Sequence, residues 1–217
     1  MFQSNPPFCN KKRFVTYNSC VDINLKEESQ ETRDRLLVKN SLANSENFKL
    51  LISEYKGKFA QYIRRRASVS KEDIEDLLQD IFIKIYLNLH GFDQSLKFSS
   101  WAYRIAHNEI ISWYRKKKIR PQINFEDYEE ENLVNYFKED TDLEKSFDRE
   151  VIKKHIKEAI EKLDERYREI IILRFLQEKE YEEISDILQI PLGTVSTLIY
   201  RGKKELQKKL EQYEPRR

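Results

Sequence analysis

Residues 73–86 read DIEDLLQDIFIKIY, a segment in which apolar residues recur at steps of three and four positions. This spacing matches the turn of an α-helix, so it predicts a helix with one apolar face and one acidic face. Ser70 stands where a helix N-cap is expected, and Asp73 favours the positive end of the helix dipole. The predicted core stripe consists of Ile74, Leu77, Leu78, Ile81, Phe82, Ile85 and Leu89.

Helical patterns flank this segment on both sides. Phe48–Ile63 carries apolar residues at helical spacing and ends in the basic cluster Arg64–Arg66. After the segment, residues 90–95, HGFDQS, predict a turn, and a further helix runs to about Lys118. Pro121 then stops this helix, because proline cannot donate the backbone hydrogen bond that would continue it.

A helix-turn-helix pattern occupies the C-terminal part of the chain. Tyr181–Gln189 predicts a short helix, Ile190 and Pro191 predict a turn, and Gly193–Leu210 predicts a longer helix. Such a motif places the first turns of its second helix in the major groove of DNA. Gln189 stands where a turn of this kind can need a positive φ, which would cost about 1 kcal/mol relative to glycine.

The composition favours helices over sheets. Charged residues make up 36% of the 217 residues, whereas glycine occurs 4 times and proline 5 times. We therefore predict an all-α protein with two small helical domains joined by an acidic linker. The expected ranges are 1–45 for an N-terminal extension that is a candidate for disorder, 46–120 for the first domain, 121–147 for the linker and 148–212 for the second domain. Within the extension, only a short helix around Glu31–Asn40 fits the pattern.

The balance of charges and the hydropathy pattern exclude several classes of protein. The chain has 40 Lys and Arg residues against 38 Asp and Glu residues, so nucleic-acid binding would depend on where these charges lie. No apolar run approaches the ~20 residues that span a bilayer. The sequence therefore predicts a cytoplasmic protein without membrane insertion.

No cofactor, metal site or enzyme activity is expected. Cys9 and Cys20 have no companion ligands at metal-binding spacing, so we expect both to be reduced and unpaired. His90, His107 and His155 lie far apart in the sequence and also lack companion ligands. A glycine-rich phosphate loop is missing, and no isolated polar residues on an apolar face indicate a catalytic pocket.

Three stretches of the chain together resemble the extracytoplasmic-function sigma factors. DIEDLLQDIFIKIY (73–86) and GFDQSLKFSSWAYRIAHNEIISWYRKKK (91–118) resemble both halves of the family's region two, at the family's spacing. LDERYREIIILRFLQEKEYEEISDILQIPLGTVSTLIYRGKKEL (163–206) resembles its region four. The resemblance implies a protein that binds core RNA polymerase, recognises promoter DNA and promotes promoter melting. The implied partners are the clamp helices of the largest polymerase subunit, the flap of the second-largest subunit, promoter DNA and an anti-sigma factor.

The resemblance also implies three sets of contact residues. The set expected to bind core polymerase comprises Asp76, Leu77, Gln79, Asp80, Ile83 and Lys84. The set expected at the minus-ten element, including a pocket for a flipped base, comprises Asp93, Gln94, Ser95, Phe98, Trp101, Arg104, Asn108, Arg115, Lys116 and Lys117. The set expected at the minus-thirty-five element comprises Thr194, Ser196, Thr197, Tyr200, Arg201, Lys203 and Lys204.

Some of these assignments have a plainer alternative. The acidic residues around Asp76 would also suit an ordinary solvated helix face, and Phe98 and Trp101 would also suit the domain core. Ser112 stands where the family often has Asp, and Ser196 and Thr197 stand where Lys and Arg are frequent. These departures concern the promoter sequence that is recognised and not the class of protein.

Two other functions remain open at this point. One is a transcriptional regulator that binds DNA through the helix-turn-helix and never engages polymerase, against which the resemblance to region two argues. The other is a protein-interaction module or a nucleic-acid enzyme, which would need a constellation of catalytic residues that the sequence lacks.

Overall fold

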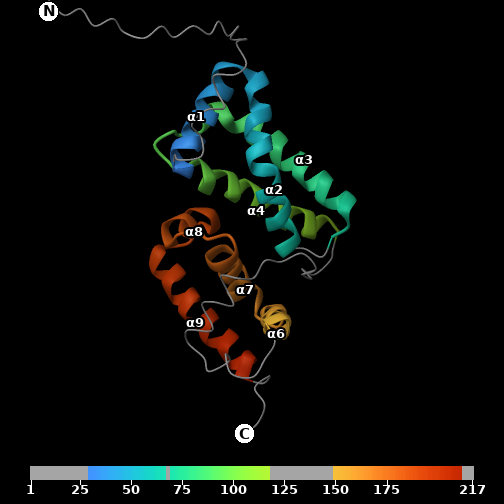
Figure 1. Ribbon diagram of the computed structural model, residues 1–217. Coiled ribbons are helices and arrows are strands. Elements are labelled where there is room, and N and C mark those ends of the chain that lie inside the picture. Colours follow the sequence, from blue (N-terminus) through green and yellow to red (C-terminus); the bar gives the residue numbers. More distant parts are fainter. Residues whose placement is uncertain (1–28, 67–68, 118–148, 212–217) are drawn as a thin grey trace, which may run out of the picture.

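The computed structural model describes residues 29–66, 69–117 and 149–211. Within these ranges all regular structure is helical, which confirms the all-α prediction. The helices form an N-terminal unit (residues 30–117) and a C-terminal unit (residues 149–211), coloured blue to green and orange to red in Figure 1. The expected linker at 121–147 lies outside the described residues, as do Cys9 and Cys20.

The N-terminal unit is built around the predicted apolar stripe. Helix α3 (Lys71–Asn88) begins at Ser70, whose hydroxyl accepts a hydrogen bond from the Asp73 amide at 3.1 Å, as a cap should. Every residue of the predicted stripe is buried, including Leu89 just beyond the helix. Helices α2 (Phe48–Arg66) and α4 (Phe98–Lys117) pack against α3 and complete the core.

Aromatic rings fill the space between these helices. Phe59 of α2 packs against Phe82 of α3 and Tyr103 of α4, with ring centroids 5.6 and 5.3 Å apart. Tyr55 meets Phe98 edge to face at 5.4 Å. Edge-to-face pairs of buried rings add to the stabilisation from burial alone, so these contacts fix how α2 lies across α4.

Helix α1 (Gln30–Ala43) covers one end of this core. Ser29 caps it, and a short 3-10 turn, η1 (Ser45–Asn47), joins it to α2. Asp34 is buried and accepts a hydrogen bond of 2.6 Å from the Tyr55 hydroxyl. Burial raises the pKa of Asp34, and the Tyr55 hydrogen bond opposes that rise. The expected N-terminal extension therefore contains a packed helix, longer than the one considered at Glu31–Asn40.

The C-terminal unit consists of α6 (Arg149–Glu161), α7 (Glu165–Ile171), a π-helical turn η4 (Ile172–Leu176), α8 (Tyr181–Leu188) and α9 (Leu192–Leu210). Helices α8 and α9 are the predicted helix-turn-helix. Gly202 lets α9 approach α7 closely, because a Cβ there would lie 3.3 Å from the Ile171 side chain. Gln189 ends α8 with a φ of 55°, the left-handed conformation that the turn was expected to require.

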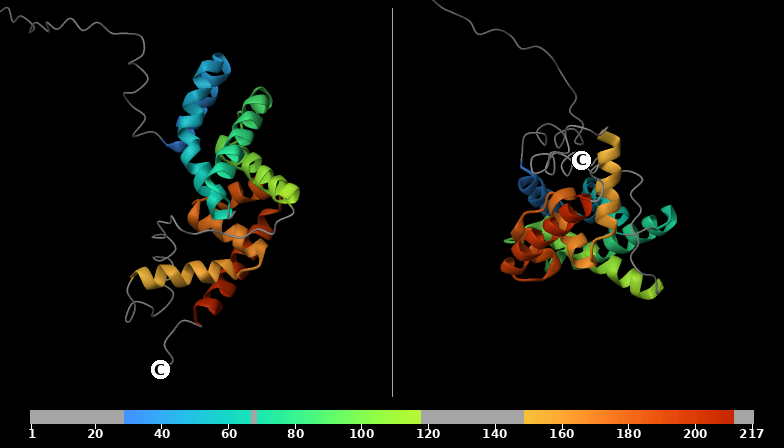
Figure 2. Two further views of the ribbon diagram at one scale, coloured as in Figure 1. Left: turned by 90° about the vertical axis from the view of Figure 1, so that its right-hand side faces the viewer. Right: turned by 90° about the horizontal axis from the view of Figure 1, so that it is seen from below.

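The two units pack directly against each other. Figure 1 draws the C-terminal unit below the N-terminal unit, with α8 next to α4, and the side view in Figure 2 agrees. Tyr103 of α4 donates a hydrogen bond of 2.8 Å to Gln177, which follows η4. The buried apolar residues of both units belong to one continuous cluster.

Replacing Gln189 by glycine should stabilise the protein. A left-handed φ strains a side chain that carries a Cβ, although here the Gln189 amide recovers part of this cost by donating to the Asp186 carbonyl at 2.6 Å. We expect Gln189→Gly to raise the free energy of unfolding by about 0.5 kcal/mol, measured by urea denaturation. Gln207→Gly, inside α9, serves as the matched control and should lower it by about 1 kcal/mol. A loss of stability at Gln189 would show that its side-chain hydrogen bond outweighs the strain.

Candidate functional site

The exposed face of α3 carries most of the residues expected to bind polymerase. Asp76, Gln79, Asp80, Ile83 and Lys84 are all exposed. Lys84 also reaches α4, where its ammonium forms an ion pair with the buried carboxylate of Glu109. Leu77 differs, because it is 2% exposed and belongs to the core stripe. A partner protein can therefore reach the acidic side of α3 but not Leu77.

An apolar groove of about 670 Å³ lies beside this acidic face, between α2 and α3. Phe48 and Ile52 of α2 form one wall, and Phe82, Ile83 and Leu87 form the other. Leu87 is 71% exposed, and Tyr86 and Ile83 are exposed beside it. Contiguous exposed apolar surface of this kind marks protein–protein contact sites. Most of this groove was not predicted from the sequence, although Tyr86 and Leu87 lie off the core stripe and could have indicated it.

The loop before α4 presents the polar residues expected to read a flipped base. Asp93, Gln94 and Ser95 are all exposed. The Ser95 amide donates a hydrogen bond of 2.9 Å to the Asp93 carboxylate and holds the loop in a tight turn. This backbone hydrogen bond lowers the pKa of Asp93 and so favours its ionised form.

One face of α4 continues from this loop. Trp101, Arg104, Asn108 and Arg115 follow one another at helical spacing, and the last two are exposed. The Trp101 ring is half-buried and lies 4.9 Å from Phe92 and 5.7 Å from Phe98, so one part of it packs while another faces solvent. Phe98 is 3% exposed and belongs to the domain core, which was the alternative interpretation of this residue from the sequence.

Basic residues end this face of α4. Arg115, Lys116 and Lys117 are exposed in the last turn, where they also suit the negative end of the helix dipole. Lys117 lies 3.3 Å from Asp73 at the start of α3 and over the Trp113 ring. Arg115 and Lys116 therefore offer the freer charges for a phosphate.

The first turns of α9 stand clear of the rest of the protein. Its exposed residues are Thr194, Ser196, Thr197, Tyr200 and Arg201. Val195 and Ile199 lie between them and are buried, so they anchor the helix in the core. The Thr197 hydroxyl donates to the Gly193 carbonyl at 2.8 Å. Further along, Lys204 is exposed, but the Lys203 ammonium lies over the Phe175 ring at 5.3 Å. This exposed face matches the part of a recognition helix that enters a major groove.

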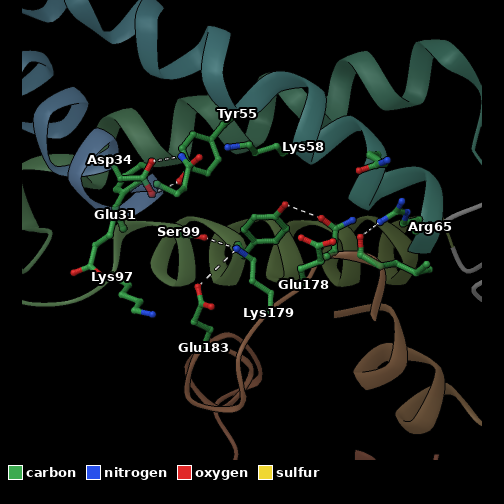
Figure 3. A pocket seen from close by; sticks show the side chains of 16 residues that line it. Glu31, Asp34, Tyr55, Lys58, Arg65, Lys97, Ser99, Glu178, Lys179 and Glu183 are labelled. Atoms are coloured by element: carbon green, nitrogen blue, oxygen red, sulfur yellow. Dashed lines mark hydrogen bonds and ion pairs between the residues drawn. The ribbon is translucent and has the colours of Figure 1, made fainter. Parts of the chain in front are cut away.

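A polar cavity of about 600 Å³ lies where the two units meet. Figure 3 shows Lys179 reaching toward Ser99 of α4, with Glu183 of α8 on its other side. Burial lowers the pKa of Lys179, and Glu183, 3.8 Å away, partly offsets that effect. The sequence predicted no role for Lys179 at this interface. Ser99 belongs to the other unit and lies 80 residues away in the sequence, so no local pattern could have indicated its contact with Lys179.

The described residues include no group of three or more His, Cys, Asp or Glu side chains placed to hold a metal ion. Among the same residues, no helix is both long enough and apolar enough to cross a membrane.

Comparison with known proteins identifies both units. Residues 51–119 match the family described as Sigma-70 region 2, and residues 154–206 match the family described as Sigma-70, region 4. The chain is 37% identical over 163 residues to the ECF RNA polymerase sigma factor SigW of Bacillus subtilis, which covers 74% of this chain and 87% of SigW. It is 32% identical over 187 residues to the ECF RNA polymerase sigma-E factor of Escherichia coli K12, covering 84% and 97% of the two chains.

The chain belongs to the extracytoplasmic-function sigma factors. It is therefore a promoter-recognising factor whose partners are core RNA polymerase and promoter DNA. Two solved structures share its fold. CnrH in complex with the cytosolic domain of CnrY matches with a TM-score of 0.59 and 22% identity, over 83% of this chain and 99% of that one. The sigma factor RpoE in complex with the anti-sigma factor NepR from Bartonella quintana matches with a TM-score of 0.57 and 21% identity, over 76% of this chain and 97% of that one. These matches confirm the resemblance seen in the sequence.

The burial of Leu77 gives a direct test of which side of α3 is the core. Leu77→Ala should lower the free energy of unfolding by about 2–5 kcal/mol, because it opens a cavity in the packed stripe. Leu87→Ala is the matched control on the same helix, and its exposed side chain should cost less than about 0.5 kcal/mol. Thermal or urea unfolding measures both, and equal losses would contradict the placement of α3.

Proposed function

We propose that this sigma factor binds core polymerase through the exposed face of α3 and the apolar groove beside it. The groove can bury apolar surface, and the charges of Asp76 and Asp80 can orient a basic partner and speed its approach. The clamp helices of the largest polymerase subunit are the proposed partner at this surface. The flap of the second-largest subunit is the proposed partner of the C-terminal unit.

The proposal for DNA assigns the minus-ten element to the 93–95 loop and α4. Asp93, Gln94 and Ser95 offer polar groups to the edge of an unstacked base, and the half-buried Trp101 offers a ring on which a base can stack. Asn108 and Arg104 extend this surface along the helix. Capturing a flipped base stabilises the open strand, which is how the protein would promote melting.

The minus-thirty-five element is assigned to α9. Thr194, Ser196, Thr197, Tyr200 and Arg201 are proposed to meet base edges, and Lys204 to meet a phosphate. Lys203 is not proposed as a direct contact, because its ammonium lies over the Phe175 ring. Phe98 is not proposed as a direct contact with the minus-ten element, because it is buried.

One observation carries the assignment as a whole: a single chain exposes an apolar groove on α2 and α3 together with two polar helical faces on α4 and α9. A regulator that only binds DNA would need α9 but not the groove.

We also propose that the first domain begins with α1 and not at residue 46, that the factor acts in the cytoplasm, where its polymerase is, and that an anti-sigma factor regulates it. The complex of RpoE with the anti-sigma factor NepR supports the last of these points.

Abortive transcription with purified core polymerase tests this function. With genomic promoter fragments, the protein should yield specific short transcripts that core polymerase alone does not make. Ile83→Asp should abolish them by placing a charge in the apolar groove, whereas Leu36→Asp, at an exposed position of α1, should not. DNA binding without transcripts would instead indicate a plain helix-turn-helix regulator.

Salt dependence separates phosphate contacts from base contacts on α9. Lys204→Ala should weaken binding of the holoenzyme about equally to all promoters and reduce the slope of log affinity against log salt by about one. Arg201→Ala, three residues earlier, should weaken binding selectively according to promoter sequence. Electrophoretic mobility shifts at several salt concentrations measure both variants, and a promoter-selective loss with Lys204→Ala would make that lysine a base reader.

A further inference from the structure

The apolar groove between α2 and α3 stays open within the described part of the chain. The buried side chains of Leu78 and Phe82 close its floor. Its rim is formed by Ile83, Tyr86 and Leu87, all of which are exposed. Soluble proteins rarely leave contiguous apolar surface of this kind in contact with water. A segment that covers the groove before polymerase arrives would therefore stabilise the free protein.

Acidic side chains lie along one edge of this groove. Glu75 belongs to its wall, and Asp76 and Asp80 lie on the adjacent exposed face of α3. No ion pair among the described residues involves these three carboxylates. Of the nearby cations, Lys84 is already paired with a carboxylate of α4, and Lys56 lines the α2 wall. The edge therefore keeps an excess of negative charge and favours a basic occupant.

One segment of this chain has the matching composition. Residues 8–17 read FCNKKRFVTY, which contains no acidic residue. Three consecutive cations at 11–13 are followed by the apolar and aromatic residues Phe14, Val15 and Tyr17. The segment lies outside the described residues, so its composition and its distance along the chain carry the assignment.

Charged and apolar residues follow the same order in this segment and along α3. The cations at 11–13 precede Phe14, and on α3 the acidic edge precedes the apolar rim at Ile83 and Leu87. Residues 11–17 can extend to about 24 Å. Positions 75–87 of α3 span roughly 18 Å, because an α-helix rises about 1.5 Å per residue. One segment can therefore meet both the acidic edge and the apolar rim.

The chain is long enough to bring this segment to the groove. Helix α1 begins beside the middle of α2, because Gln30 donates a hydrogen bond of 3.2 Å to Glu54. Glu54 is close in the sequence to Ile52, which lines the groove from the other side of α2. The stretch from residue 17 to residue 29 can extend to about 40 Å, whereas α2 is about 10–12 Å across. The path around α2 is therefore well within reach.

Tethering makes even a weak contact effective. A segment joined to its site by a linker of this length meets that site at an effective concentration on the order of 1 mM. A contact with a dissociation constant of about 0.1 mM would then be closed in about ten of every eleven molecules. Because polymerase binds only the open form at this surface, its apparent affinity would fall about tenfold.

We propose that residues 8–17 dock into the apolar groove between α2 and α3 of the same chain and compete there with core polymerase. The cations at 11–13 lie against the acidic edge, and Phe14 lies over the apolar rim beside Leu87. This inference rests on the proposed function, because it concerns the regulation of the surface assigned there to polymerase. The segment acts as a competitor within the chain, and polymerase displaces it on binding.

Cross-linking of the full chain in the absence of polymerase tests the docking. The two cysteines of the chain, Cys9 and Cys20, lie on either side of the basic and apolar residues of the segment. In the Cys20→Ser variant, benzophenone maleimide is attached to Cys9, and the linkage formed on irradiation is located by mass spectrometry. We expect a linkage within one chain to residues 48–56 or 75–87, and its loss when core polymerase is added in excess. A linkage elsewhere in the chain, or to a second copy, would overturn the proposal.

Affinity for core polymerase tests the competition. Phe14→Asp removes the apolar anchor and adds a charge that the acidic edge repels, but it leaves the groove intact. It should abolish the cross-link from Cys9 and tighten binding to immobilised core polymerase about tenfold, measured by surface plasmon resonance. Phe2→Asp makes the same change outside the segment, so this matched control should alter neither result. An unchanged polymerase affinity in Phe14→Asp would count against the competition and refute the inference.

Failure of the proposed function and failure of this inference give different results. A groove that does not bind polymerase would leave the polymerase affinity of Ile83→Asp unchanged, while the cross-link from Cys9 to the groove would still form in the otherwise wild-type chain. A groove that binds polymerase but not the segment would give weakened polymerase binding with Ile83→Asp and no cross-link to the groove.

Discussion

The burial of one face of α3 is the constraint on which the rest of this structure depends. Its apolar stripe leaves no choice about which side meets α2 and α4, and the acidic residues of the same helix must then face outward. The packing of α2 against α3 also forms the walls of the apolar groove, which Phe48 of α2 lines together with Phe82, Ile83 and Leu87 of α3. One hydrophobic contact thus builds both the core and the surface proposed for polymerase.

Helical periodicity predicted the elements well. The ends of α2, α3, α8 and α9 lie within a residue or two of the ranges expected from sequence, because each has an apolar stripe and a turn signal next to it. Helix α1 was only partly foreseen. Its apolar stripe is weak, and it is held by the hydrogen bond between the buried Asp34 and Tyr55, 21 residues apart, which periodicity does not indicate.

The polar interior was the part that sequence reasoning could not reach. Arg65 and Arg66 were expected in a basic helix end, where arginine is usually solvated and complements the helix dipole. They are buried because their partners arrive from the other unit, with Glu169 separated from Tyr62 by 107 residues. In the same way, Leu77 and Phe98 matched a family surface by position, yet their place in the apolar stripe and the aromatic cluster governs where they lie.

The π-helical turn at Ile172–Leu176 has a geometric consequence for the whole chain. Its backbone bond runs from the Gln177 amide back to the Ile172 carbonyl, one residue farther than in an α-helix. Removing one residue here would restore a regular turn and rotate everything after it by about 100° relative to α7. The helix-turn-helix would then face a different direction while α7 kept its place. The length of this single turn therefore determines the angle at which the helix-turn-helix is oriented relative to α7, the helix that carries Glu169.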